Sequence, residues 1–241
     1  MTTQTSINRT ALMFTGWAGP FQVVIWSLGF IVFSGFWPNI PSPSASSEEI
    51  ASFFWDNTVG MRIGTVLMYF GCVAFCIWGA SVAALTRVGE RGIPVLTYAQ
   101  LTLVGCGGAI GAVNFTLWSV ASFRPDGLSP DVIRMLNDIG FFFLLWSVPI
   151  FSGWCVVVGI SIMCDKSKNP ILPRWNMYFN FMVAFMMLPG SLITFFHEGP
   201  FAFDGFFGFY IPLLVYGSWV LLMSWSVLSA AYKLPKQEFN S

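Results

Sequence analysis

The only histidine of the chain stands beside two acidic residues, and this grouping is the clearest candidate for acid–base chemistry. His197 is followed directly by Glu198 and, a few residues later, by Asp204. Because imidazole titrates near neutral pH, His197 could act as a general acid or base, oriented by Glu198 or Asp204. Asp138 is a second candidate for that catalytic role. The alternative is a water-exposed histidine, since metal sites need several ligands; we predict no metal site and name no cofactor.

A second set of polar residues could bind a small molecule without transforming it. Arg62 and Asp138 each stand at the start of a long uncharged segment, where partial burial would require a partner, and they could pair with each other. Asn114 is the amide placed most deeply within such a segment. Amides of this kind also serve as hydrogen bonds between helices, so packing is the alternative to ligand contact.

The stretch from Phe201 to Tyr210 is unusually rich in aromatic residues and follows the histidine. Aromatic walls beside a polar rim suit a flat or greasy small molecule, although the same residues could simply face lipid. With this stretch included, the predicted ligand-binding residues are Arg62, Asn114, Arg124, Asp138, Phe203 and Phe206.

Six segments without Asp, Glu, Lys, Arg or His must position these residues. Each has at least 22 residues, and a helix needs roughly 20 to cross the hydrocarbon core of a bilayer. The segments are apolar on all faces, whereas the strands of a membrane barrel alternate. We therefore predict an all-α, polytopic membrane protein with a single transmembrane domain over residues 1–241. The six helices are expected at about 11–36, 63–86, 94–122, 139–164, 175–196 and 205–232.

Composition agrees with a chain embedded in the lipid bilayer. Hydrophobic residues make up 56% and charged residues 9%, against roughly 25% charged in soluble domains. Net charge is zero and no phosphate-binding glycine motif is present, so no nucleic-acid partner is expected. The spans contain no charge at all, which argues against proton relays and ion-coupled transport.

The Lys and Arg residues between the segments predict orientation, because positive residues are retained on the cytoplasmic side. One side carries eight of them: Arg9, Arg87, Arg91, Lys166, Lys168, Arg174, Lys233 and Lys236. The other side carries Arg62, Arg124 and Arg134. Both termini are therefore predicted to be cytoplasmic, with the protein in a bacterial inner (cytoplasmic) membrane.

Two short amphipathic helices are expected on the outer side. Ser46 and Glu49 have the spacing of a capping box, and Ile50, Phe53 and Phe54 follow on one helical face. The second helix would begin at Ser129 and Pro130.

Small residues and proline predict where helices approach closely or bend. Gly107 and Gly111 would let the third span act as the central helix or as the contact of a homo-oligomer. Pro189 and Gly190 form the strongest break within a span. The five cysteines lie in or at the ends of spans and are expected to be reduced.

Three functions remain open from the sequence. The first is binding or facilitated passage of a small apolar or amphiphilic molecule through an outward-opening, aromatic-lined cavity. The second is a membrane enzyme with acid–base or metal chemistry at the outer rim. The third is a non-catalytic subunit of a larger membrane assembly. The lack of a dense catalytic constellation places the enzyme below binding or passage.

Overall fold

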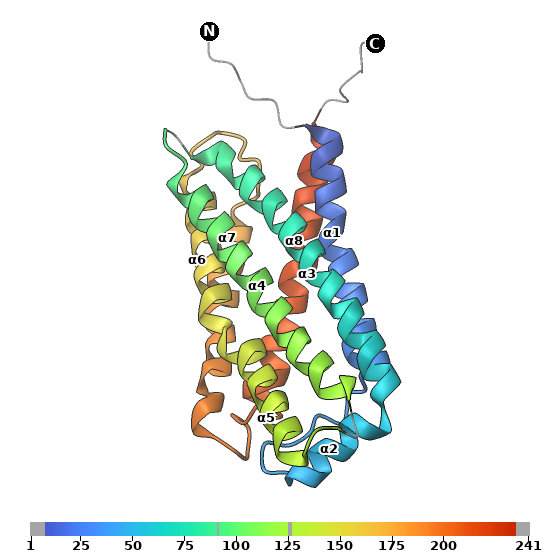
Figure 1. The fold of residues 1–241 in the computed structure, drawn as a ribbon. Coiled ribbons are helices and arrows are strands. Elements are labelled where there is room, and N and C mark those ends of the chain that lie inside the picture. The colour runs from blue at the N-terminus through green and yellow to red at the C-terminus, as the bar shows by residue number, and fades with distance from the viewer. Residues whose placement is uncertain (1–7, 91, 125–126, 235–241) are drawn as a thin grey trace, which may run out of the picture.

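The computed structural model describes residues 8–90, 92–124 and 127–234, and within these ranges the chain is all-helical with no strand (Figure 1). Six helical stretches are long and apolar enough to cross a membrane, which confirms the predicted number of spans. They are Arg9–Phe33, Thr58–Gly89, Val95–Phe123, Pro130–Cys164, Trp175–Phe195 and Phe206–Lys233.

Most spans combine an α-helix with a short segment of another helical type. The elements, in chain order, are α1 (Arg9–Ser27), η1 (Leu28–Phe33), α2 (Ser47–Asp56), α3 (Thr58–Thr86), η2 (Arg87–Gly89), α4 (Val95–Phe123), α5 (Pro130–Phe141), η4 (Phe142–Trp146), α6 (Val148–Cys164), α7 (Trp175–Met187), η5 (Leu188–Phe195), η6 (Phe206–Tyr210) and α8 (Ile211–Lys233).

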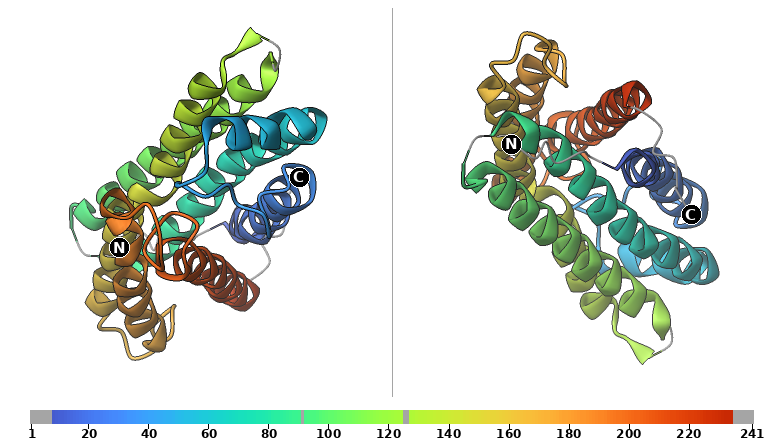
Figure 2. Two further views of the ribbon diagram at one scale, coloured as in Figure 1. Left: turned by 90° about the horizontal axis from the view of Figure 1, so that it is seen from below. Right: turned by 90° about the horizontal axis from the view of Figure 1, so that it is seen from above.

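The spans form a bundle in which each helix packs on its neighbours in the chain. α1 packs on α3, α3 on α4, α4 on α6, α6 on α7, α7 on α8, and α8 returns to α1; the end-on views of Figure 2 show this arrangement. α3 also contacts α6 and α8 across the bundle. In the most apolar 18-residue stretch of this span 56% of the residues are buried, against 33% in the corresponding stretch of α4. The central helix is therefore α3, and the prediction that the glycine-rich third span is central is wrong.

The two ends of the bundle differ in charge. α1 begins and α8 ends at the same end, which we call the Arg9 end, whereas α2 covers the other end, called the α2 end (Figure 1). The Arg9 end holds Arg9, Arg87, Lys166, Lys168, Arg174 and Lys233, and the α2 end holds Arg62, Arg124 and Arg134. The predicted Arg91 and Lys236 lie outside the described residues. Which end faces the cytoplasm stays a prediction.

α2 folds over its end of the bundle. The Ser46 hydroxyl accepts from the Glu49 amide at 3.2 Å and the Glu49 carboxylate accepts from the Ser46 amide at 2.9 Å, which confirms the capping box. Ile50 and Phe54 are fully buried against the spans. This apolar face is what holds α2 on the bundle.

The second predicted outer helix is not separate from the membrane span. α5 starts at Pro130 as expected, but it continues through the π-helical segment η4 into α6, so that Pro130–Cys164 is one long stretch. Ile133 and Asn137 of α5 are fully buried, because α5 packs on α4 and α2. α5 is thus an extension of the fourth span and not a surface helix.

Glycines allow an unusually close approach between α3 and the end of the first span. A Cβ on Gly29 would lie 2.6 Å from the Gly64 carbonyl oxygen, and one on Gly60 would overlap the Phe33 carbonyl. Asn57 supports the same contact by donating to the Phe33 carbonyl at 2.7 Å. The Gly60-x-x-x-Gly64 pair therefore makes the tightest helix contact at this end, and the sequence reading missed it.

The predicted oligomer glycines are used within the chain. A Cβ on Gly107 would lie 3.2 Å from Phe151 of α6, and one on Gly111 would lie 3.0 Å from the Cys72 thiol of α3. Gly107 is buried. These two glycines thus make contacts between helices of the same chain, and the homo-oligomer stays a prediction.

Four spans leave α-helical geometry in the half of the bundle near α2. η1, η4 and η6 are π-helical, and η5 is a 3-10 helix that begins beside Pro189, as the predicted break requires. Residues of all four segments, among them Phe30, Leu145, Ile193 and Phe209, lie in one buried cluster. Since π-helical segments occur frequently at functional sites, this half is the place to look for one.

The turn between α3 and α4 predicts a measurable dependence of stability on pH. Burial would raise the pKa of Glu90, but hydrogen bonds from the Leu96 amide at 2.6 Å and from Thr97, together with the Arg87 charge, lower it. A lowered pKa in the folded state stabilises the fold above the ordinary pKa of glutamate. This contribution is lost as pH falls through the folded value. We expect the unfolding midpoint in detergent to fall in acid, and Glu90→Gln to flatten that fall.

The matched control is Glu48→Gln, because Glu48 is exposed in α2 and accepts no hydrogen bond among the described residues. Unfolding midpoints measured across the acidic range should keep their pH dependence in this variant. An equal flattening in both variants would show that Glu90 does not cap α4 in solution.

Candidate functional site

The half near α2 is filled by aromatic side chains, which we call the aromatic cluster. Phe36 lies 4.5 Å from Trp118 and 4.9 Å from Phe30 between ring centroids, and Phe141 and Phe203 stack at 4.4 Å with nearly parallel rings. The full set is Phe30, Phe36, Phe54, Phe115, Trp118, Phe141, Phe203 and Phe209. In this structure these rings pack against one another, and the outward-opening, aromatic-lined cavity stays a prediction.

The two phenylalanines predicted to contact a ligand have different surroundings. Phe203 is 3% exposed and covers Phe141, whereas Phe206 is 56% exposed at the start of η6. Both come from the stretch between η5 and α8, which folds back through hydrogen bonds from the Phe207 and Gly208 amides to the Pro200 carbonyl. Phe203 thus plugs the aromatic cluster and Phe206 lies outside it.

Polar atoms without partners lie where α4 crosses α5. Asn114 and Asn137 are fully buried, and neither amide makes a hydrogen bond of good geometry in the described chain, although Asn137 lies near enough to the Asp138 carboxylate to interact with it. The indole N–H of Trp118 is equally unpartnered. A Cβ on Gly140 would overlap that nitrogen, so Trp118 lies directly on α5. We call Asn114, Trp118 and Asn137 the crossing residues.

The three crossing residues form a row along the antiparallel helices. Asn114 and Trp118 are one turn apart on α4, and Asn137 and Gly140 are nearly one turn apart on α5. With Trp118 against Gly140, Asn114 lies one turn deeper and Asn137 nearly one turn closer to the α2 end. Asn114 was expected to be deeply buried and is. Asn137 was not among the predicted site residues, although its spacing from Ile133, Gly140 and Phe141 marks the buried face.

These unpartnered atoms destabilise the protein when no ligand is bound at the crossing. A buried donor or acceptor without a partner costs about 1–3 kcal/mol, and native proteins contain few of them. Unpartnered indole N–H groups occur also at Trp78 and Trp154, so what sets the crossing apart is its two amides with both polar atoms unpartnered. The crossing therefore has the chemistry to hold a small polar group inside an aromatic environment.

The amides of Gln100 and Asn180, in the half near the Arg9 end, do make hydrogen bonds. Gln100 donates to Thr86 at 2.9 Å and to Ser161 at 3.0 Å, and Asn180 accepts from Trp219 at 2.9 Å. Gln100 keeps an unpartnered oxygen among the described atoms, but its nitrogen is satisfied. Here the amides join helices, which is the alternative role that the sequence left open.

The charged residues predicted to hold a ligand lie at the edge of the crossing. Arg62 donates to the carbonyls of Ser122 at 3.0 Å and Phe123 at 2.8 Å, so it neutralises the C-terminal end of α4. The expected pairing of Arg62 with Asp138 is wrong, because these carbonyls hold the guanidinium. Asp138 instead lies 3.9 Å from Arg134, one helical turn away.

Arg124 is exposed and lies over the ring of Phe123, with 5.4 Å between the guanidinium carbon and the ring centroid. It is close in sequence to the crossing but not buried with it. A role in ligand contact stays a prediction for this residue.

The candidate catalytic residues lie at the α2 end of the bundle, in α5 and in the loop between η5 and η6. His197 and Glu198 are exposed in the loop after η5, and no hydrogen bond joins them, Asp138 or Asp204 to one another in the described ranges. Among the same residues no group of three or more His, Cys, Asp or Glu could hold a metal ion. Their chemistry remains untested. Asp138 follows Asn137 directly on α5 and has a buried Oδ1 without a hydrogen-bond partner in the described chain, and His197 lies near enough to Asp138 for their charges to interact.

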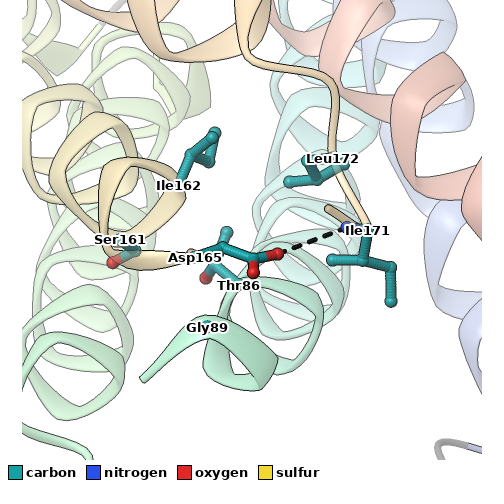
Figure 3. Close-up of a pocket in the computed structure, with 7 residues that line it drawn as sticks. All are labelled: Thr86, Gly89, Ser161, Ile162, Asp165, Ile171 and Leu172. Atoms are coloured by element: carbon teal, nitrogen blue, oxygen red, sulfur yellow. Dashed lines mark hydrogen bonds between the residues drawn. The ribbon is translucent and has the colours of Figure 1, made fainter. Parts of the chain in front are cut away.

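A small hollow lies at the Arg9 end (Figure 3). Its volume of about 10 Å³ is room for one water molecule at most. It is lined by Thr86, Gly89, Ser161, Ile162, Asp165, Ile171 and Leu172. Asp165 accepts from the Ile171 amide at 3.3 Å, as the figure shows. This hollow belongs to the packing of two loops and offers no room for a small organic molecule.

The α4–α5 crossing is the part of the molecule best suited to a functional site. It combines buried unpartnered donors and acceptors with aromatic walls, and it lies where four spans leave α-helical geometry. Comparison with known protein families, curated proteins and solved structures finds no match for this chain. The chemistry of the crossing residues is then the basis on which a function can be chosen.

Proposed function

We propose that this membrane protein binds a small uncharged amphiphilic molecule at the α4–α5 crossing, in the half of the bundle near α2. The observation that carries the proposal is the pair of fully buried amides, Asn114 and Asn137, neither of which makes a hydrogen bond of good geometry in the described chain. A bound molecule would supply the missing hydrogen bonds and recover the free energy that the empty site loses.

Binding requires the aromatic cluster to open, and Phe203 is the side chain that would move. It comes from a loop and not from a long helix, and it stacks on Phe141. The adjoining η5 and η6 segments are 3-10 and π-helical, and both have looser hydrogen bonding than an α-helix. Displacement of Phe203 would expose the crossing while leaving the core cluster around Trp78, Trp154 and Trp219 intact.

The side from which the molecule enters follows from charge. The positive residues gathered at the Arg9 end favour a cytoplasmic location for that end and for both termini, in a bacterial inner membrane. The α2 end would then face outward, and the site would open to the outer leaflet or to the space beyond it. Transfer of the molecule across the membrane would be a further step of the same function.

Photoaffinity labelling of the purified full chain tests the proposal. A medium-chain alcohol that carries a diazirine should label the buried faces of α4 and α5, in peptides that contain Asn114 and Asn137. Phe203→Ala should increase that labelling severalfold, because the variant removes the side chain that covers Phe141. Labelled peptides are identified by mass spectrometry, and excess unlabelled alcohol should compete.

The matched control is Phe206→Ala, which removes an equally large ring that is 56% exposed. It should leave interior labelling unchanged. If label appears only on lipid-facing residues such as Val113 and Met135 in every variant, the binding function is lost. The chain would then be better described as a subunit of a larger membrane assembly.

A further inference from the structure

We infer that the molecule bound at the α4–α5 crossing carries a hydroxyl group at its polar end, that is, a long-chain alcohol. This inference rests on the proposed binding function and names the class of ligand for the same site. Three features of the crossing support it: donors and acceptors both lack partners, the nearby charges oppose a charged head group, and the side chains are closely packed.

The crossing offers unpartnered acceptors and unpartnered donors together. The acceptors are the side-chain oxygens of Asn114 and Asn137 and the buried Oδ1 of Asp138, all without a hydrogen-bond partner in the described ranges. The donors are the two amide nitrogens and the indole N–H of Trp118. A ketone or an ether would satisfy only the donors, and a hydrocarbon would satisfy neither. A hydroxyl group both donates and accepts, so it can satisfy atoms of both kinds.

Donor and acceptor come to the same face of α5. Asn137 and Asp138 are consecutive on this helix, and the Asn137 amide lies near enough to the Asp138 carboxylate to interact with it. Gly140 is three residues after Asn137, and residues at this spacing are neighbours on a helix surface. A Cβ on Gly140 would overlap Trp118 Nε1. A head group beside Asn137 would therefore meet an indole donor from α4 and acceptors from α5.

The charges beside Asn137 favour an uncharged head group. An anionic head group would lie next to the Asp138 carboxylate, which would repel it. A cationic head group at the free oxygen of Asp138 would lie close to Arg134, whose Nε is 3.9 Å from the other oxygen of the same carboxylate. Because either sign of charge meets a like charge, a neutral hydroxyl is the better ligand.

The packing at the crossing favours a small head group. Asn114, Trp118 and Asn137 are all fully buried, and Phe141 is covered by Phe203. A hydroxyl adds one heavy atom, whereas a primary amide, which also donates and accepts, needs three. The alkyl chain behind the hydroxyl would replace Phe203 against Phe141, where burial of apolar surface stabilises it.

Competition for the diazirine label tests the class of ligand on the full chain. Undecan-1-ol and 1-methoxydecane are isomers, and only the alcohol can donate a hydrogen bond. The alcohol should compete about tenfold better than the ether, because one hydrogen bond to a buried acceptor contributes about that factor. Undecan-1-amine, which is protonated at neutral pH, should compete less than the alcohol because of Arg134.

Variants locate the hydroxyl. Asp138→Leu removes an unpartnered acceptor, so it should reduce the advantage of the alcohol over the ether severalfold. Trp118→Phe removes the indole donor and should weaken both isomers. Asp56→Leu is the matched control for Asp138→Leu, because Asp56 is exposed at the end of α2 and forms no ion pair among the described residues. Since both isomers are compared in every variant, their different partition into detergent cancels.

The outcomes separate this inference from the binding function. If the probe labels the interior but the alcohol and the ether compete equally, the hydroxyl assignment is overturned and the binding function stands. The assignment also fails if the amine competes best, or if Asp56→Leu reduces the advantage of the alcohol as much as Asp138→Leu does. If the interior is never labelled, both are overturned.

Discussion

Alanine at Gly64 is expected to destabilise the protein by about 3 kcal/mol, at the upper end of what an overpacked core costs. A Cβ at this position would lie 2.5 Å from the Gly29 carbonyl oxygen and 3.0 Å from the Ser34 amide nitrogen. Both neighbours are backbone atoms, so no side-chain rotation can relieve the contact. The first span would have to move away from α3. Thermal unfolding of the purified protein in detergent measures the loss.

Gly105→Ala is the matched control, because a Cβ there has nothing within 4 Å. Both substitutions gain the same helix propensity, up to about 1 kcal/mol, so their difference isolates the packing contact. If the two variants unfold at the same temperature, α3 and the end of the first span do not approach as closely as the structure shows. Ligand binding offers a second readout, since displacement of η1 would disturb the aromatic cluster.

The six spans could be predicted from the sequence because they depend on local properties. Length, apolarity and the absence of charge are read residue by residue, and they gave the fifth span as 175–196 against Trp175–Phe195 in the structure. The capping box at Ser46 is equally local. The fourth helix was predicted to begin at 139, whereas the helical stretch begins at Pro130. The polar residues of α5 suggested a surface helix, although Ile133 and Asn137 pack on the bundle.

The candidate site was harder to predict because it depends on which atoms meet. Asn114 could be identified from its depth in an apolar segment, but Asn137 stands beside Asp138 and resembles the polar start of a helix. Arg62 was expected to pair with a carboxylate, whereas the nearby end of α4 offers carbonyls that accept equally well. The aromatic stretch after His197 indicated rings near the site without showing whether they line a space or fill it.

The structure divides the bundle into a half that holds the fold together and a half that can change. Near the Arg9 end, Trp78, Trp154 and Trp219 pack edge to face at 4.8–5.5 Å, and the amide of Asn180 is bonded through both of its polar atoms. Near α2, π-helical and 3-10 segments replace α-helix and buried amides stay unpaired. Residues kept for binding commonly reduce stability, so the two halves should respond oppositely to the same substitution.

Asn137→Leu is accordingly expected to stabilise the empty protein by about 1–3 kcal/mol, because leucine removes two unpartnered polar atoms from a fully buried position. The same variant should lose its ligand. Asn180→Leu is the matched control. Its amide donates to the Asn176 carbonyl at 2.8 Å and accepts from Trp219, so leucine should destabilise by a similar amount.

Unfolding midpoints of both variants, measured in detergent without added ligand, should therefore move in opposite directions from the wild-type value. A fall in stability for Asn137→Leu as large as that for Asn180→Leu would mean that Asn137 is satisfied within the protein and that the crossing is packing alone. A rise in stability without any loss of interior labelling would separate the unpaired amide from binding and place the ligand elsewhere. Only a gain in stability together with a loss of labelling identifies Asn137 as a residue retained for its ligand at the expense of the fold.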